Sequence, residues 1–512
     1  MSRFYLTTAI DYANGTPHIG HAYEKIGADA IARWRRIRGD DVHFLVGMDE
    51  HGQTVAQKAA ELGRTPQQQV DAIAPLFETM WRRLAITNDQ FVRTTTPAHH
   101  AGVQALIERI FARSPDDFYE RSYTGWYCVG CESFKQDAEI ADGKCILHPT
   151  RTLEWVEERN WFFRLSRYRD FLRAHYEQHP RFLQPESRRN EMVSLLEQGL
   201  EDISASRSRF AWGVPFPRPL STGEPQTTYV WFDALPNYLT GTGFPVGDWE
   251  RRWPAQLHVI GKDIIRFHCV IWPAMLEAAG LPLPERVWAH GFVHFGGQKL
   301  SKTAGVAIDL DEAIARHGSD ALRYFLLREV SWDADGNFTW ERFDERYTAD
   351  LADAFGNLVS RVLAMIERYR GGTVPAAAPT ELDAFAEGAL TRYAEAMDNF
   401  LLHRGAAAAW ELVFEANAYV DRRAPWAQAK ARDDAALDET LGALARCLAR
   451  LAVLTAPFMP SAAGRVWSSL GLGESFAEQG AWVHAANPQS AGRTATRISP
   501  LFPKPEPPGG PR

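Results

Sequence analysis

The chain has 512 residues, of which 45% are hydrophobic and 23% are charged, as in ordinary globular proteins. No basic leader with an apolar core precedes the first predicted strand, and no apolar run reaches the length of a membrane span, so we expect a soluble, cytoplasmic protein without a membrane partner. The formal net charge of −8 argues against a protein that coats nucleic acid generally, but RNA can still bind at local basic clusters such as 33–38 and 446–450.

The first motif of the chain joins a predicted strand to a predicted helix. Residues 4–10 are rich in β-branched and aromatic side chains, which predicts a buried strand, and residues 22–34 have apolar side chains at helical spacing. Between them, Asn14 begins a predicted turn, and Pro17 fits the first turn of the helix, where its missing N–H costs nothing.

Two histidines, His18 and His21, are predicted to lie on one face of this first helical turn. Backbone N–H groups and the positive end of the helix dipole attract phosphate oxygens, and the imidazoles add donors. Gly20 has no Cβ, so a purine or ribose can approach the backbone closely. The motif predicts a site for a nucleoside triphosphate; the alternative is an ordinary helix start with two surface histidines.

A second predicted strand, at residues 41–47, ends just before Asp49. A strand, a helix and a strand in this order predict a parallel sheet whose ligands bind at the carboxyl ends of its strands. Asp49 is therefore a candidate ligand-facing carboxylate, and the alternative is a turn or cap carboxylate. The sequence predicts an α/β protein with a Rossmann-like, parallel-sheet catalytic domain.

Residues 115–224 break this pattern and are predicted to be an insertion with a zinc knuckle. Two pairs of ligands, each with a two-residue gap, can wrap one tetrahedral ion, which predicts a closed, structural site with one Zn²⁺ per chain. The predicted ligands are Cys128, Cys131, Cys145 and His148. The alternative is a set of buried or surface thiols. Cys269 and Cys447 stand alone, so we expect small apolar core residues there.

Strand character returns after the insertion. Residues 227–233 are predicted to be a strand, 257–263 a strand and turn, and 264–272 a helix, whereas 160–165 indicate packing and turn elements. A sheet that resumes beyond a metal-bearing insertion implies one nucleotide-binding domain in two halves.

A lysine loop follows. Lys299 and Lys302 flank a small hydroxyl residue after a Gly-Gly pair, ahead of a plausible helix start with an acidic first turn. Two lysines in such a loop can place ammonium charge on the β- and γ-phosphates as charge develops there. The alternative is an ordinary solvated surface loop.

From about residue 350 the chain is alanine-rich, which predicts an antiparallel bundle with helices at 350–370, 381–400, 403–422 and 434–455. From Pro500 the chain is rich in Pro and Gly, so we expect an extended or disordered tail. The predicted domains are a first catalytic half at 1–114, the insertion at 115–224, a second catalytic half at 225–298, a lysine-loop region at 299–349, the helical domain at 350–475 and a C-terminal tail at 476–512.

Together, the histidine and lysine motifs resemble the H-I-G-H and K-M-S-K-S signatures of class I aminoacyl-tRNA synthetases, with Leu300 and Thr303 as departures in the second. From Phe4 to about Phe502 the chain is similar to the methionyl-tRNA synthetases. Besides the zinc knuckle, that similarity rests on the segments 212–215, 229–234, 261–264 and 424–426.

The resemblance implies an enzyme that joins L-methionine to ATP as methionyl-adenylate, releases pyrophosphate, and passes methionine to the 3′ end of tRNA(Met) with a CAU anticodon. It implies Mg²⁺ with ATP and an anticodon-binding role for the helical bundle. The chain ends without the further RNA-binding domain that some members use to dimerise, so we expect a monomer. Asp11 and Met48 stand beside the pocket where the family usually has other residues.

The resemblance also implies roles for individual residues. The residues that would bind ATP and stabilise the transition state are His18, Gly20, His21, Lys299 and Lys302, with Glu24 and Asp263 at the ribose. The methionine site would consist of Ile10, Asp49, Trp231, Tyr238, Phe267 and His268. The anticodon would be read by Asn357, Arg361 and Trp426. Without the resemblance, those last three are a solvated helix face and a packing residue.

Two other functions are compatible with parts of the sequence. A small-molecule nucleotidyl transferase can use the histidine motif, but it leaves the helical domain without a role. A catalytically silent paralogue that only binds RNA is expected to lack a lysine or histidine of the two motifs, and this chain keeps all four. Methionine-dependent ATP–pyrophosphate exchange separates the three possibilities.

Overall fold

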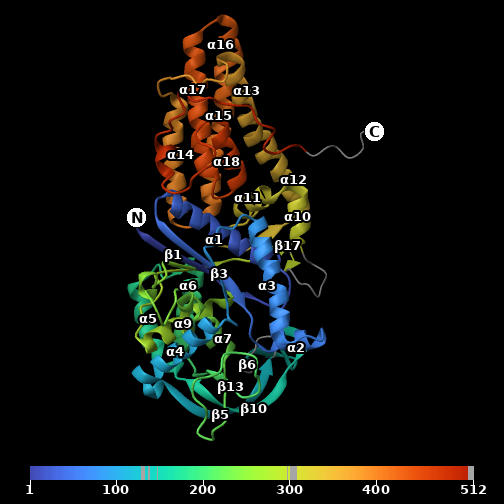
Figure 1. Ribbon diagram of the computed structural model, residues 1–512, viewed down its shortest axis with the longest axis vertical. Helices are drawn as coiled ribbons and strands as arrows, with labels where there is room; N and C mark the ends of the chain where they lie inside the picture. Colours follow the sequence, from blue (N-terminus) through green and yellow to red (C-terminus); the bar gives the residue numbers. More distant parts are fainter. Residues whose placement is uncertain (129–132, 136–138, 147, 297, 300–307, 505–512) are drawn as a thin grey trace, which may run out of the picture.

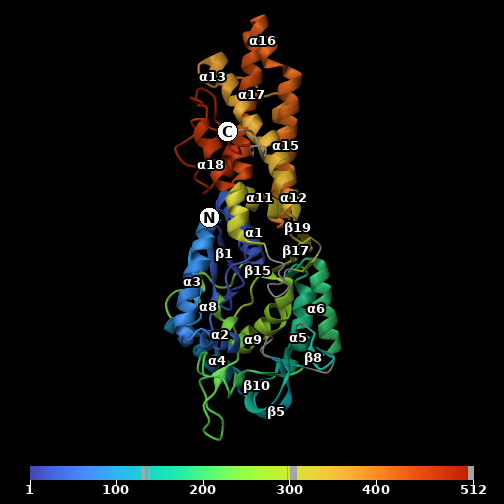
Figure 2. The same ribbon diagram turned by 90° about the vertical axis from the view of Figure 1, so that its right-hand side faces the viewer.

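The structure is a computed structural model that describes residues 1–128, 133–135, 139–146, 148–296, 298–299 and 308–504. The molecule is elongated: a helical bundle occupies one end, a sheet with its helices the middle, and a group of antiparallel strands the other end (Figures 1 and 2). Among the described helices, none combines the length and the apolarity needed to cross a bilayer.

The middle of the molecule is built on a sheet whose strand pairs, within the described residues, are all parallel. The strand order is β11-β16-β15-β1-β3-β2, with β4 also paired to β3. The strands are β1 (Arg3–Thr8), β2 (Asp11–Tyr12), β3 (Asp41–Asp49), β4 (Gln90–Arg93), β11 (Leu183–Gln184), β15 (Leu257–Gly261) and β16 (Val287–His290). The predicted parallel sheet is confirmed, and the carboxyl ends of β1, β3 and β15 meet at one edge.

Different helices cover the two faces of the sheet, because successive side chains of a strand point to opposite faces. Phe4 and Leu6 pack in one hydrophobic cluster with α1 and α3, whereas Tyr5 packs in a second cluster with α4 and α9. These helices are α1 (Ile19–Ile37), α3 (Pro66–Arg83), α4 (Pro97–Arg113) and α9 (Trp272–Ala279). Because β1 is covered on both faces, its successive residues Phe4, Tyr5 and Leu6 are all apolar and buried, which makes the strand recognisable in the sequence.

Antiparallel strands form the end of the molecule away from the bundle (Figure 1). The long strands β5 (Phe118–Cys128) and β10 (Glu154–Phe163) pair along their whole length. The packing expected of 160–165 is confirmed, since Phe162, Phe163 and Leu165 are buried, but the expected turn is wrong at 160–163, which complete β10. The other elements of the segment are β6 (Ser133–Lys135), β7 (Ile140–Ala141), β8 (Lys144–Cys145), β9 (His148–Thr152), α5 (Arg169–Gln178), α6 (Glu186–Gln198), β12 (Ile203–Ser204) and β13 (Ser206–Arg207).

The strand predicted at 227–233 is wrong beyond β14 (Thr227–Thr228). The chain turns into α7 (Val230–Ala234), and α8 (Asn237–Thr240) follows. Aromatic and β-branched side chains favour a strand locally, but Phe232 and Leu235 both bury in the cluster under α4 and α9, and their three-residue spacing suits a helical turn. The helix predicted at 264–272 is confirmed in part, since irregular helical turns there lead into α9.

The bundle contains the predicted helices, with bounds that agree within a few residues except at 350–356, where π-helical turns precede α13. Its helices are α13 (Asn357–Arg370), α14 (Glu381–Asp398), α15 (Leu402–Arg423), α16 (Pro425–Ala431), α17 (Asp434–Thr455), α18 (Pro460–Ser469) and α19 (Trp482–Ala486). Between the sheet and the bundle lie β17 (Val293–Phe295), β18 (Gln298–Lys299), α10 (Leu310–His317), α11 (Ser319–Glu329), β19 (Gly336–Phe338) and α12 (Trp340–Arg346).

The end of the described chain packs on the protein. Leu501 and Phe502 are buried, and the Tyr347 hydroxyl donates a 2.7 Å hydrogen bond to the Pro503 carbonyl. The expectation of an extended or disordered tail from Pro500 is wrong for these residues, because two apolar side chains among the prolines fit against the helical turns that precede α13. Residues 505–512 lie outside the described ranges.

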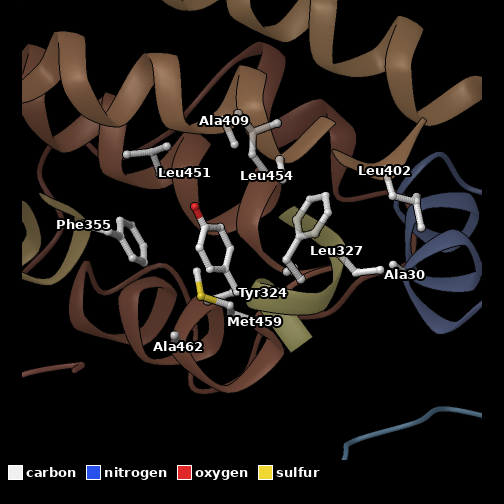
Figure 3. Close-up of a cluster of buried hydrophobic side chains, with 14 of the residues drawn as sticks. Ala30, Tyr324, Leu327, Phe355, Leu402, Ala409, Leu451, Leu454, Met459 and Ala462 are labelled. Carbon is white, nitrogen blue, oxygen red and sulfur yellow. The ribbon is translucent and has the colours of Figure 1, made fainter. Parts of the chain in front are cut away.

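Helix α11 joins the sheet domain to the bundle through a continuous hydrophobic cluster (Figure 3). Leu327 points toward Ala30 of α1, and Tyr324 lies among side chains of the bundle such as Leu454 and Met459. These residues are fully buried or nearly so. Helix α1 and the bundle therefore belong to one packed unit.

A buried carboxylate strengthens this junction. Asp29 of α1 accepts hydrogen bonds from Arg33 at 2.7 Å and from Arg323 of α11 at 2.6 Å, and all three side chains are buried. Arg323 also donates to the carbonyls of Pro457 and Phe458, at the turn between α17 and α18. Burial alone would raise the pKa of Asp29, but the two guanidinium groups outweigh it and hold the pKa at about 2.

Several arginines of the two basic clusters are engaged in such ion pairs. Arg33 pairs with Asp29 and Glu478, and Arg446 and Arg450 both pair with the buried Asp383. These arginines hold helices together. The basic clusters at 33–38 and 446–450 are therefore not the open RNA-binding surfaces that their positive charge suggests.

Replacing Asp29 tests the junction. Asp29→Asn leaves the buried Arg323 guanidinium without its anionic partner, and loss of one member of a buried ion pair costs about 3–5 kcal/mol of unfolding free energy. Arg392→Met, which removes an exposed pair with Glu411, is the control and should cost less than ~1 kcal/mol. Urea denaturation at pH 7 measures both, and equal effects would contradict the assigned role. In the wild-type protein, the contribution of Asp29 to the free energy of unfolding should be lost as the pH falls through about 2, because the carboxylate is then protonated.

Candidate active site

The site begins at the first turn of α1. His18 is the N-cap residue of α1, with an extended backbone, and its Nδ1 accepts a hydrogen bond of 3.2 Å from the Gly20 N–H. The Nδ1 of His21 accepts in return from the His18 N–H, at 3.4 Å. The two rings stack with centroids 3.6 Å apart. Pro17 therefore precedes the cap and is not part of the first helical turn.

This reciprocal cap selects one tautomer for both histidines. In neutral imidazole, one nitrogen accepts and the other carries the proton, so acceptance at Nδ1 puts the proton on Nε2. The pair thus presents N–H donors at the positive end of the α1 dipole, where anions bind favourably. A Cβ at Gly20 would lie 3.1 Å from Cε1 of His18, so any other residue there would push the His18 ring aside by a few tenths of an ångström.

Behind this turn lies a buried charged network that sequence reasoning missed. The Lys25 ammonium is 2.8 Å from both Asp11 and Glu24, and the second oxygen of Glu24 lies 3.2 Å from Nε2 of His290. Burial raises the pKa of Asp11 to about 7, although Lys25 opposes this. Burial would also raise the pKa of Glu24, but Lys25 and His290 hold it below its ordinary value. Glu24 thus lies in a buried network.

Three predicted site residues lie at the carboxyl edge of the sheet. Ile10 follows β1, Asp49 ends β3, and Asp263 follows β15, which pairs directly with β1. The backbone of Lys299 lies in β18, which pairs with β17, and α1 contacts β17. Lys302 lies outside the described residues. The structure therefore brings the histidine motif, the strand ends and the start of the lysine loop to one side of the sheet.

An aromatic cluster forms one wall of this region. The rings of Trp231 and Phe267 stack at 3.6 Å with an interplanar angle of 6°, and both are partly exposed. Behind them, the buried Tyr238 hydroxyl is 2.6 Å from Nε2 of His268, whose Nδ1 lies 3.0 Å from the carbonyl of Ile264.

The His268 tautomer follows from these two bonds. A carbonyl only accepts, so Nδ1 carries the proton and Nε2 accepts from the Tyr238 hydroxyl. Burial lowers the pKa of His268 to about 4, which keeps the ring neutral at physiological pH. In this arrangement the donors of Tyr238 and His268 are directed to protein acceptors.

A second polar group that the sequence does not reveal is Asp233, because the pattern at 227–233 predicts a strand. Asp233 is fully buried and contacts His51 and His99 from two other elements. Its partners are 182 and 134 residues away in the sequence, so no local pattern pairs them.

The predicted zinc ligands are described only in part. Cys128 and Cys145 are both buried and pack in one small cluster with Leu153. Cys145 pairs with His148 across the β8–β9 turn, which puts their Cα atoms opposite each other. Cys131 and the His148 side chain lie outside the described structure. Within the described part of the chain, no group of three or more His, Cys, Asp or Glu side chains is arranged to hold a metal ion. Cys269 and Cys447 are buried in hydrophobic clusters, as predicted.

The predicted anticodon residues lie on the bundle. Trp426 is on α16, at the end of the molecule farthest from the sheet, and its residue is 48% exposed (Figures 1 and 2). Asn357 is exposed at the start of α13, and Arg361 one turn later is 3.0 Å from Asp421 near the end of α15. That ion pair places Arg361 close to the α15–α16 turn that carries Trp426.

Comparisons with known proteins agree along the whole chain. Residues 4–152 and 138–363 match the family "tRNA synthetases class I (M)", and residues 370–504 match the "anticodon binding domain of methionyl tRNA ligase". Methionine–tRNA ligase of Thermotoga maritima is 41% identical over 98% of this chain and 80% of its own length, and that of Mycobacterium tuberculosis (strain CDC 1551 / Oshkosh) is 42% identical over the whole of both chains.

Solved structures are equally similar. The M. tuberculosis methionyl-tRNA synthetase in complex with methionyl-adenylate superimposes with a TM-score of 0.92 at 40% identity, covering 98% of this chain and 100% of that one. The free form of the same enzyme gives a TM-score of 0.86 at 38% identity, covering 99% of each chain.

Proposed function

The chain belongs to the methionyl-tRNA synthetase family of class I aminoacyl-tRNA synthetases, and from this membership we propose how its residues divide the reaction. The enzyme activates L-methionine with ATP to methionyl-adenylate, releases pyrophosphate, and transfers methionine to tRNA(Met). The observation that supports the assignment most is the histidine cap of α1, which lies at the same edge of the sheet as Asp49 and Asp263.

In adenylation, the methionine carboxylate attacks the α-phosphate of ATP, and the bond to pyrophosphate breaks. Such a step needs positioning and charge stabilisation more than a protein nucleophile. His18 and His21 donate from Nε2 to phosphate oxygens, while Lys299 and Lys302 neutralise the departing pyrophosphate. Gly20 lets the nucleotide approach the backbone closely, and Glu24 and Asp263 lie at the ribose of ATP. Mg²⁺ would enter the site bound to the phosphates of ATP.

The lysine role predicts a large loss of activity. Lys302→Ala should slow methionine-dependent ATP–pyrophosphate exchange by roughly a hundredfold or more, the scale of losing one transition-state donor, with a smaller effect on the methionine KM. Lys58→Ala on α2 (Gln53–Glu61), an exposed lysine paired with Glu61, is the matched control and should leave exchange unchanged. An unchanged rate in Lys302→Ala would remove the lysine loop from the mechanism.

For methionine, we propose that Asp49 takes the amino group and that Ile10, Trp231 and Phe267 surround the thioether. Sulfur–aromatic contacts add ~0.3–1.5 kcal/mol each, which suits an unbranched, polarizable side chain. Tyr238 and His268 close the base of the pocket. The Tyr238 hydroxyl donates to Nε2 of His268, and Nδ1 of His268 donates to the Ile264 carbonyl. Both residues therefore shape the pocket around the thioether and do not donate hydrogen bonds to its sulfur.

For zinc, the donor set fits the metal, since thiolates and imidazole are its preferred ligands. Cys128 and Cys145 are buried in one cluster, and Cys145 lies opposite His148 in the β8–β9 turn; with Cys131 they complete the proposed Cys₃His set. Bound zinc would cross-link the two ends of this small antiparallel region, and we propose that the region faces the acceptor end of tRNA.

Metal analysis tests this site. The purified protein should contain about one zinc per chain, and Cys145→Ala should lose it. Cys447→Ala, a buried cysteine of the bundle, is the control that should retain it. Because the site is peripheral to the sheet, Cys145→Ala should lower tRNA charging more than exchange. Fully active wild-type protein without zinc would contradict the assignment.

For the anticodon, we propose that Trp426 stacks on a base while Asn357 and Arg361 contact base edges. Unstacked RNA bases are recognised by aromatic platforms with nearby amide and guanidinium donors. The exposure of Trp426 and the position of Arg361 beside Asp421 support this arrangement.

Trp426→Ala should weaken tRNA binding by about 1–3 kcal/mol, the value of one stacked base. Charging of tRNA(Met) at low tRNA concentration should fall, while exchange, which needs no tRNA, stays intact. Phe414→Ala, an equally exposed aromatic on α15, is the control for loss of a surface ring. Equal losses in exchange and charging would mean that Trp426 only supports the fold.

A further inference from the structure

Asp233 forms a bridge between three elements. From α7, its Oδ2 accepts a 2.6 Å hydrogen bond from Nδ1 of His51, which follows β3, and its Oδ1 accepts a 2.9 Å bond from Nε2 of His99 on α4. The three side chains are nearly or completely buried. We call these three residues the Asp233 bridge.

The bridge joins the two segments that supply the proposed methionine site. Asp233 is two residues beyond Trp231 in the same short helix, and His51 is two residues beyond Asp49. The His51 backbone N–H also lies 3.4 Å from Oδ1 of Asp49. A shift of the α7 backbone relative to the end of β3 would therefore stretch or rotate the bond between Asp233 and His51.

Neighbouring groups fix both histidines. Nδ1 of His99 lies 2.8 Å from the Thr240 hydroxyl, and the Trp212 ring packs edge-on against His51 at 5.3 Å. The Trp212 indole N–H donates to the Glu50 carbonyl, beside His51, at 2.7 Å. Next to the bridge is a cavity of about 20 Å³, on the scale of one water molecule. The contacts of Thr240 and Trp212 hold the two histidines in place on Asp233.

Electrostatics favour the bonded form. Burial alone would raise the pKa of Asp233, but His51 and His99 hold it well below its ordinary value. Burial lowers the pKa of His51, but Asp233 outweighs this and raises it. An apolar cluster of similar volume often stabilises a fold as well as a buried ion pair. A carboxylate differs from an apolar cluster because its two oxygens accept hydrogen bonds in defined directions. A group of this kind can therefore hold its neighbours in a fixed orientation.

We propose that Asp233, held by His51 and His99, is a positioning residue that sets Trp231 and Asp49 at the separation that binds methionine. The inference rests on the proposed methionine site and adds to it a group that does not touch the substrate. It predicts a defect confined to methionine recognition, because the ATP-binding histidines lie on α1, outside the bridge.

Variants of His51 separate positioning from general stability. The amide nitrogen of Asn takes about the place of histidine Nδ1, so His51→Asn keeps a donor for Asp233, whereas His51→Ala removes it. In pyrophosphate exchange, His51→Ala and Asp233→Asn should raise the methionine KM roughly ten- to a hundredfold, the size of effect typical when a partner that orients a metal ligand is lost. The ATP KM should stay within about twofold, as expected of a group that acts on one substrate. His51→Asn should restore most of the methionine KM.

Two references complete the experiment. Asp350→Asn, which removes a buried carboxylate bonded to Tyr324 far from the sheet edge, should lower the thermal midpoint and leave both KM values unchanged. Trp231→Ala tests the pocket itself: an unchanged methionine KM there would overturn the proposed methionine site. If Trp231→Ala raises the methionine KM but His51→Ala does not, the methionine site stands and the positioning role of Asp233 is wrong. The same conclusion follows if His51→Asn is as defective as His51→Ala. The two His51 variants decide the question even if Asp233→Asn does not fold.

Discussion

The placement of helix α1 is the constraint on which the rest of this structure depends. Its first turn holds the stacked pair His18 and His21, and its buried middle holds Asp29, which pairs with Arg323 and through it reaches the turn between α17 and α18. One helix therefore connects the turn proposed to bind phosphate to the bundle that carries Trp426. The sheet and the bundle pack directly against each other, because they share one hydrophobic cluster.

The charged groups of the interior divide into two kinds. Asp29 and Asp383 each hold two arginines and fasten helices to one another. Asp233 and Glu24 instead lie beside the proposed substrate sites, where a buried carboxylate with fixed partners orients its neighbours. Burying a carboxylate is costly unless its oxygens accept hydrogen bonds. Each of these four carboxylates accepts hydrogen bonds from at least two donors.

The sequence predicted those parts of the fold whose signals are local. The strand and helix around His18 and the bundle helices have strong periodicity. The histidine and lysine motifs predict the site only as a pair, since each alone also fits an ordinary surface segment. The errors at 227–233 and at Phe502 arose because tertiary packing decided the conformation of apolar segments that locally favour something else. The partners of Asp233 lie more than a hundred residues away, so only the folded chain reveals them.

The most direct test of the account is a crystal structure with a stable analogue of methionyl-adenylate. Its phosphate-mimicking group should lie at the first turn of α1, within hydrogen-bond distance of Nε2 of His18 or His21, with the thioether against Trp231 and the amino group on Asp49. An analogue that binds with its phosphate group away from this turn would contradict the assignment of α1 as the centre of the active site.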